Sequence, residues 1–428
     1  MRARVVLTVL LLSASLWAQK NTARTAVPTR ASQIAQAESA MDREQWPEAE
    51  AILRKLVAAN PKDALAWFDL GYVMHAVGNY PEAIAAYRGA VAAQPESFEC
   101  NLNLGMILAH EKKPEAAQVL LKATQLQPTG EHPRQSLARA WAALAELRSA
   151  DAKAALAAWA KAAELDASTQ NLLAYGDALE SSGDASGAET QFRRAADAEP
   201  QSPQPQAALA NLYVRGKRLP EAELALRKVL AAKPQDENAH LQLGRVFSAE
   251  KKDEDATAEL QKALALRPDD WDAVRELAFI AERGKHWAEA EKQYRALTLR
   301  FPADAEARNG LGSALLGELS YAEARDEFLR CLKLKPEWGE AYGQLALAAA
   351  GNKEYELAIK SLDERKKWLP ESASSYFLRA TSYDHLRLYK VAAENYKAFL
   401  KASNGQFPDD EWKARHRLIA IDPEARKK

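Results

Sequence analysis

Cysteine is nearly absent from this sequence, since Cys100 and Cys331 are the only two among 428 residues. A disulfide needs Cα atoms within about 7 Å of each other. The two cysteines fall in what we count below as the third and ninth of a series of stacked repeats, which places them too far apart to be bridged. We therefore expect two buried thiols that behave as small hydrophobic side chains.

An excess of charge of either sign is also missing. The 58 Lys and Arg residues against 59 Asp and Glu residues give a formal net charge of −1. A domain that binds nucleic acid usually carries a strongly basic face, so we expect no nucleic acid partner.

The motifs of catalysis and metal binding are missing as well. The seven histidines include no HExxH pair, and none lies beside a cysteine at metal-ligand spacing. We find no GxSxG elbow, no phosphate loop before a lysine and no strand pattern. The sequence thus predicts no catalytic residue, no cofactor and no metal, and we expect the protein not to be an enzyme.

The one notable hydrophobic run lies at the N-terminus. Arg2 and Arg4 precede the apolar stretch Val5–Leu12, and a small residue, Ala18, follows a few positions later. This order is typical of a secretory signal peptide, and the stretch is shorter than the roughly 20 residues that span a bilayer. We expect cleavage after Ala18 and a periplasmic or secreted protein without membrane insertion. A retained membrane anchor is the alternative.

What the sequence does contain is a fixed period. Six prolines follow one another at intervals of 34 residues, and such self-similarity indicates one supersecondary unit stacked many times. The six are Pro200, Pro234, Pro268, Pro302, Pro336 and Pro370.

Each unit reads as two helices that end at the proline. In the second helix an alanine precedes a large apolar residue by four positions, as Ala222 precedes Leu226, so both lie on one face. In the first helix Gly or Ala recurs at one position, as at Gly312, although glycine is costly inside a helix. We infer that the two helices approach too closely there for a larger side chain. The turn between them often carries an aromatic residue such as Tyr321, which we expect to be a wedge between helices rather than part of a cofactor site.

The pattern resembles the tetratricopeptide repeat. The resemblance rests on two sets of residues at the family's spacing: Trp67, Leu70, Gly71, Ala83, Tyr87, Ala90 and Pro95, and then Leu172, Gly176, Ala188, Phe192, Ala195 and Pro200. It implies an all-α fold, a right-handed superhelical α-solenoid of about eleven helix-turn-helix repeats with a C-terminal capping helix. It also implies that the partners are other proteins or peptide segments.

The period is broken once inside the array. Between Pro128 and Ala167 the step is 39 residues instead of 34, and the excess lies in a turn-rich segment at 129–135. We expect a hinge there that separates repeats 1–3, at 30–128, from repeats 4–11, at 136–403.

Segments outside the repeats complete the organisation. Residues 1–18 form the expected signal peptide, 19–29 a linker, 408–421 the capping helix and 422–428 a frayed tail. In the capping helix we expect Trp412, Leu418 and Ile419 to cover the last repeat, while Lys413, Arg415 and Arg417 face water.

The resemblance implies that four positions of each first helix line a partner-binding groove. Carried over to this sequence, the candidates are Leu65, Phe68, Tyr72, His75, Leu102, Met106, Asn211, Arg245, Arg275, Phe279 and Asn309.

Two interpretations of these residues stay open. In one, Phe68 and Tyr72 anchor a partner, and the arginines with Asn211 and Asn309 recognise its carboxylates or backbone. In the other, Phe68 and Tyr72 pack against the first repeat, and Arg245 and Arg275 pair with neighbours such as Asp272 or Glu282.

The sequence therefore predicts an exported scaffold, without enzymatic activity, that binds other proteins through this groove. The alternative is a periplasmic accessory subunit of an envelope export or assembly machine, such as one for exopolysaccharide or pilus secretion.

Overall fold

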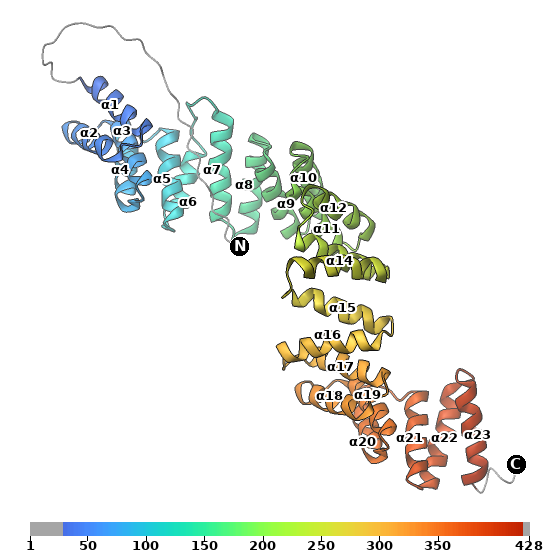
Figure 1. The fold of residues 1–428 in the computed structure, drawn as a ribbon. Helices are drawn as coiled ribbons and strands as arrows, with labels where there is room; N and C mark the ends of the chain where they lie inside the picture. The colour runs from blue at the N-terminus through green and yellow to red at the C-terminus, as the bar shows by residue number, and fades with distance from the viewer. Residues whose placement is uncertain (1–28, 423–428) are drawn as a thin grey trace. The chain divides into compact units, whose positions relative to one another are not determined.

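A computed structural model of the chain describes residues 29–422 (Figure 1). The expected signal peptide and almost all of the expected linker and tail lie outside these residues. Every regular element between residues 29 and 422 is an α-helix, and there are 23 of them. They form two compact units, residues 29–216 and 217–422, which we describe separately.

The first unit contains α1 to α11, which follow one another with short connections. Their bounds are α1 Arg30–Asp42, α2 Trp46–Ala59, α3 Ala64–Ala76, α4 Tyr80–Ala93, α5 Phe98–His110, α6 Ala116–Ala123, α7 Pro133–Leu147, α8 Ala152–Leu165, α9 Thr169–Ser181, α10 Ala185–Ala198 and α11 Pro203–Arg215.

The second unit contains α12 to α23. Their bounds are α12 Leu219–Ala232, α13 Glu237–Ala249, α14 Asp253–Leu266, α15 Trp271–Arg283, α16 Trp287–Arg300, α17 Ala305–Gly317, α18 Tyr321–Leu334, α19 Gly339–Gly351, α20 Tyr355–Arg365, α21 Ala373–His385, α22 Tyr389–Ser403 and α23 Pro408–Ile421.

Within each unit, consecutive helices form repeats in which the first helix, A, packs on the second helix, B. Each B helix also packs on the A helix of the next repeat within its unit, and A helices of successive repeats contact each other, as α15 contacts α17 and α17 contacts α19. The A helices therefore form the inner layer of each stack and the B helices the outer layer. The prediction of an all-α solenoid of eleven repeats with a capping helix is confirmed.

The small residue in the A helix marks the closest approach of the two helices. A Cβ atom added to Gly71 would lie 2.7 Å from the ring of Tyr87 on α4, and one added to Gly312 would lie 2.7 Å from the ring of Phe328 on α18. Both rings are buried. The inference that these helices approach too closely for a larger side chain is confirmed at both positions.

The aromatic residues at the starts of B helices lie between repeats, as predicted for wedges. The ring of Tyr321 lies against Gly351 at the end of the next A helix, where an added Cβ atom would collide with it. Tyr355 stacks on His385 with the ring centroids 4.4 Å apart, and Tyr80 lies 4.6 Å from His110. In each pair the second residue is 30 positions after the first, so one contact recurs along the chain.

The turns between A and B helices share one backbone geometry. One residue in every repeat but the fourth has a positive φ, which L-residues other than glycine adopt only at a cost. Only two of the ten are glycines: the residues are Glu44, Gly78, Lys112, Gly183, Lys217, Lys251, Lys285, Leu319, Lys353 and Arg387. The packing of the two helices therefore determines the backbone conformation of these turns more strongly than the intrinsic φ preference of the turn residue does.

The chain departs from this regularity between the third and fourth repeats. α6 is only eight residues long, and the connection from it runs to Pro133, where α7 begins inside the insertion expected at 129–135. A hinge at this segment stays a prediction. The boundary between the compact units lies elsewhere, between Gly216 and Lys217 in the sixth repeat, and the sequence did not indicate it.

The capping helix is present, but our expectation for its faces was wrong. Leu418 is buried, whereas Trp412 is 62% exposed and Ile419 is 54% exposed. The loop before the helix explains this, because one Glu411 carboxylate oxygen accepts hydrogen bonds from the Ser403 hydroxyl, at 2.6 Å, and the Gly405 N–H, at 2.7 Å. These bonds draw Glu411 inward and turn Trp412 outward.

The basic residues of the capping helix also differ from expectation. Arg417 does not simply face water: its guanidinium donates two hydrogen bonds to Asp384 on α21, at 2.6 and 2.7 Å. α23 is therefore attached to the last repeat by an ion pair as well as by Leu418.

Both cysteines are buried and free, as expected for small hydrophobic side chains. Burial raises the pKa of the Cys331 thiol to about 11. A thiol with so little thiolate character is a poor nucleophile.

Candidate partner-binding surfaces

The first candidate surface lies on α3, in the first unit. Leu65 is 43% exposed, while Phe68 and Tyr72 are half-buried against the core. Phe68 meets Tyr87 edge to face with ring centroids 5.8 Å apart, and Tyr72 meets Trp46 of the first repeat at 6.2 Å. The two aromatic residues thus take part in packing. The contact of Tyr72 is with the first repeat, as the second interpretation held, whereas the ring that Phe68 meets belongs to its own repeat.

The other candidates of the first unit offer little more surface. Leu102 is buried in the core, so its side chain is not accessible to a partner, and Met106 is half-buried beside it. Burial lowers the pKa of His75, and the nearby His110 lowers it further. Asn211 on α11 is exposed.

The second candidate surface is the inner layer of the second unit, where both predicted arginines are paired. Arg245 lies 3.2 Å from the Asp272 carboxylate and 3.1 Å from that of Glu276. Arg275 lies 2.7 Å from Asp304. The pairing with Asp272 matches the second interpretation. The partner of Arg275 does not, because Glu282 accepts its hydrogen bond from Tyr294 instead.

Large apolar side chains remain exposed on the same layer. Phe279 on α15 is 51% exposed, and the guanidinium of Arg283 lies 5.3 Å from its ring centroid. Leu347 occupies the equivalent position on α19, two repeats further on, and is 47% exposed. We had not named Leu347 from the sequence, although its position in the repeat marks it in the same way as Phe279. Asn309 lies between them and is half-buried.

Carboxylates line one edge of this layer. Glu306 and Glu340 are the second residues of α17 and α19, and both are exposed. Neither forms an ion pair with any residue between 29 and 422. Glu340 accepts a hydrogen bond from the Trp338 indole N–H at 2.9 Å. Because Arg245 and Arg275 are already paired, this surface presents apolar groups and carboxylates without ion-pair partners rather than free cations.

Family models of the tetratricopeptide repeat match residues 34–98, 76–131, 280–337 and 179–246, which together make up more than half of the sequence. The chain belongs to the tetratricopeptide repeat family. This membership suggests a scaffold for protein interactions, and the fold generally serves in that way without catalysis. No curated protein matches the sequence.

Several solved structures of tetratricopeptide repeat proteins are similar to this one. A protein from Parabacteroides merdae is 17% identical with a TM-score of 0.42, over 55% of this chain and 93% of that one. A chain of the APC/C hetero-tetramer Cut9–Hcn1 is 14% identical with a TM-score of 0.41, over 90% of this chain and 96% of that one. YrrB, described as having an unusual peptide-binding site, is 21% identical with a TM-score of 0.41, over 43% and 95%.

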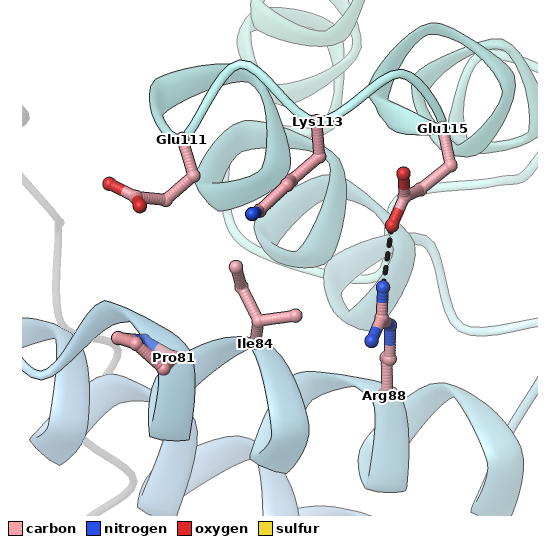
Figure 2. A pocket seen from close by; sticks show the side chains of 6 residues that line it. All are labelled: Pro81, Ile84, Arg88, Glu111, Lys113 and Glu115. Carbon is pink, nitrogen blue, oxygen red and sulfur yellow. Dashed lines mark hydrogen bonds and ion pairs between the residues drawn. The ribbon is translucent and has the colours of Figure 1, made fainter.

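A hollow also lies between α4 and the turn that connects α5 to α6 (Figure 2). Ile84 and Pro81 form its apolar side, and the ion pair between Arg88 and Glu115, at 2.5 Å, closes one end. Lys113 and Glu111 complete the lining, so the charges balance. None of the residues predicted from the sequence lies here, and the hollow indicates no ligand.

Two further observations concern metal sites and membrane spans. No group of three or more His, Cys, Asp or Glu side chains within residues 29–422 could hold a metal ion. Among the helices described, none combines the length and apolar character that a membrane span requires.

One buried carboxylate in the second repeat was not predicted from the sequence. Asp69 on α3 is 7% exposed, and its Oδ2 atom has no hydrogen-bond partner. Burial, together with the charges of Glu38 and Asp63, raises the pKa of Asp69 to about 7. Arg30 does not neutralise it, because this arginine is bound to both oxygens of Asp63, at 2.5 and 2.6 Å.

This carboxylate predicts a pH dependence of stability. Because the pKa is raised above that of the unfolded chain, the folded state binds the additional proton, and stability falls as the pH rises from about 4 through 7. We expect Asp69→Asn to increase the free energy of unfolding by about 1 to 3 kcal/mol at pH 8 and by much less at pH 4. Urea unfolding of the protein at both pH values measures this.

The matched control is Asp42→Asn, which alters an exposed aspartate on α1 of the same unit. It should change stability little at either pH. A gain for Asp69→Asn of equal size at pH 4 and pH 8 would show that the ionised carboxylate is not the cause.

Proposed function

We propose that this chain is an exported scaffold without enzymatic activity, and that segments of other proteins bind along the inner layer of its A helices. The observation that supports this most directly is the exposure of Phe279 and Leu347 at one repeat position of that layer. Apolar groups left in water at equivalent positions add contact area for a partner at no cost to folding. An extended partner that follows the stack would meet them in succession.

The polar groups of the layer contribute less to this proposal than the apolar ones. Asn309 is half-buried between the two apolar residues, but its side-chain oxygen is itself buried and is not accessible to a partner. Phe68 and Tyr72 are half-buried in aromatic contacts, so the first unit would contribute a smaller part.

Export is the second part of the proposal. Its support is the order of basic residues, apolar run and small residue from Arg2 to Ala18. We expect the intact mass of the protein recovered from its native host to correspond to a chain that starts at Gln19. A mass that includes residues 1–18 would contradict export with cleavage. The narrower role, as an accessory subunit of an envelope machine for exopolysaccharide or pilus secretion, would add membrane proteins to the partners that co-purify.

A pair of double variants tests the binding surface. Phe279→Ser with Leu347→Ser should lower the affinity for peptides selected from a displayed random library on the exported form by about tenfold or more, because each anchor contributes more than 1 kcal/mol. Both residues are exposed, so the helical circular dichroism should not change.

The control is Leu224→Ser with Leu299→Ser, which removes two exposed leucines from the outer helices α12 and α16 of the same unit. Its affinity should equal that of the unaltered chain. Equal losses in both double variants, or no loss in either, would place the binding surface elsewhere than on the inner layer.

A further inference from the structure

The arginines of the inner helices α13 and α15 are all bound to carboxylates. Arg245 is shared between two of them, because Asp272 and Glu276 lie 3.2 and 3.1 Å from it. Two more arginines each have one carboxylate partner: Arg275 has Asp304, and Arg283 has Asp253. A partner's carboxylate would therefore have to displace a carboxylate of the chain itself before it could bind these arginines.

Three further carboxylates of this layer have no cationic partner. Glu306 and Glu340 are exposed at the starts of α17 and α19, and Glu282 is half-buried near the end of α15. Glu340 accepts a hydrogen bond from the uncharged indole of Trp338. Glu282 accepts one from the uncharged hydroxyl of Tyr294. None of the three carboxylates forms an ion pair with any residue between 29 and 422, so negative charge is in excess on this layer.

One cation approaches the layer from an outer helix. The side chain of Arg365 on α20 lies beside Gly343, 3.5 Å from where a Cβ atom of that glycine would be. Its guanidinium donates a hydrogen bond to the Pro370 carbonyl oxygen at 2.8 Å. Even if this charge is counted against one of the three carboxylates, two remain uncompensated. A partner that lies along α15, α17 and α19 thus meets a negative surface.

The glutamates at the helix starts share a helix face with the exposed apolar residues. Glu340 and Leu347 are seven residues apart on α19, which is two helical turns or about 10 Å. Glu306 has the same repeat position on α17, whose repeat lies between those of Phe279 and Leu347. A lysine or arginine of a segment that contacts the apolar residues therefore has a carboxylate within reach of its long side chain.

The spacing of the repeats sets the spacing of residues in such a segment. A helices of successive repeats contact each other, and packed helices lie about 8–10 Å apart, so Phe279 and Leu347, two repeats apart, are separated by about 16–20 Å. An extended chain rises about 3.3 Å per residue, and about five or six residues cover this distance.

We propose that the inner layer of the second unit selects a basic partner, namely an extended protein segment in which lysine or arginine lies between two large apolar residues. The apolar residues contact Phe279 and Leu347, and the basic residues lie opposite Glu306 and Glu340. The inference rests on the proposed function, since it names the kind of segment that the same surface binds. The carboxylates add selectivity more than affinity, because each exposed ion pair contributes little binding energy.

Two labelled twelve-residue peptides test the charge preference by fluorescence anisotropy. Both carry two leucines six positions apart in a Gly/Ser background, and the two residues midway between the leucines are lysines in one peptide and glutamates in the other. At low ionic strength the lysine peptide should bind at least about tenfold more tightly. The ratio should shrink at about 1 M salt, where the Debye length is about 3 Å. Equal binding of the two peptides, tighter binding of the glutamate peptide, or no binding of the lysine peptide would overturn the proposal.

Charge reversals locate the preference. Glu306→Lys with Glu340→Lys should abolish or invert the ratio between the two peptides. The control, Glu254→Lys with Glu356→Lys, changes the net charge equally on the outer helices α14 and α20. All four glutamates are exposed and lie in the first turns of their helices, so the substitutions interact alike with the helix dipoles. The control should keep the tenfold ratio. Equal effects of the two double variants, or an unchanged ratio in both, would overturn the proposal.

The outcomes separate this inference from the proposed function. If both peptides bound equally, and both lost affinity with Phe279→Ser and Leu347→Ser, the inner layer would remain the binding surface and its preference for basic segments would be refuted. If neither peptide and no displayed peptide bound the inner layer, both the inference and the proposed function would be refuted.

Discussion

The contact on which the structure depends is the close approach of helix A and helix B within a repeat. At Gly312 the A helix comes near enough that the ring of Phe328 occupies the space of a side chain. This contact sets the spacing of the two layers, and the other recurring contacts follow from it. The aromatic wedge at the start of a B helix reaches the end of the next A helix, and a residue in the turn takes a positive φ even where it is lysine.

The close approach of helices A and B also determines which side chains of the A helices are buried and which stay accessible to a partner. Side chains directed toward the B helix are buried, and Leu102 shows that a position assigned to the groove can be drawn into the core. Those directed inward from the A helices are left to water or to a partner. In the second unit these include Phe279 and Leu347, and they lie beside arginines that are already neutralised by neighbouring carboxylates. Our account of binding therefore relies on apolar contacts more than on the arginines.

Much of the fold could be predicted because it is repeated. The prolines, the small residues and the aromatic wedges recur at the same positions in most repeats. The assignment of helices in one repeat can therefore be checked against the others. The features that could not be predicted occur once. The outward face of Trp412 depends on the loop that Glu411 holds, and the partner of Arg275 depends on how far the next repeat brings Asp304. The burial of Asp69 beneath the first repeat likewise has no signal in its neighbours along the chain.

The orientation of α23 follows from one of these single features. A helix placed in the register of a further repeat would have packed its apolar residues against α21 and α22. With the loop held by Glu411, α23 buries Glu411 and Ala414 and leaves Trp412 exposed. The helix that caps the array thus exposes an aromatic side chain that we expected to cover the last repeat.

The central claim, that the approach of helices A and B governs the stack, is tested by replacing two helical glycines of the second unit with alanine. In an open helix this change stabilises by about 1 kcal/mol. We expect that gain for Gly343→Ala, since its Cβ atom would lie 3.5 Å from the side chain of Arg365. Gly312→Ala should instead destabilise by about 1 to 3 kcal/mol, because its Cβ atom would lie 2.7 Å from the buried Phe328 ring. Urea unfolding midpoints that shift in opposite directions would support the account, and equal stabilisation by both substitutions would contradict it.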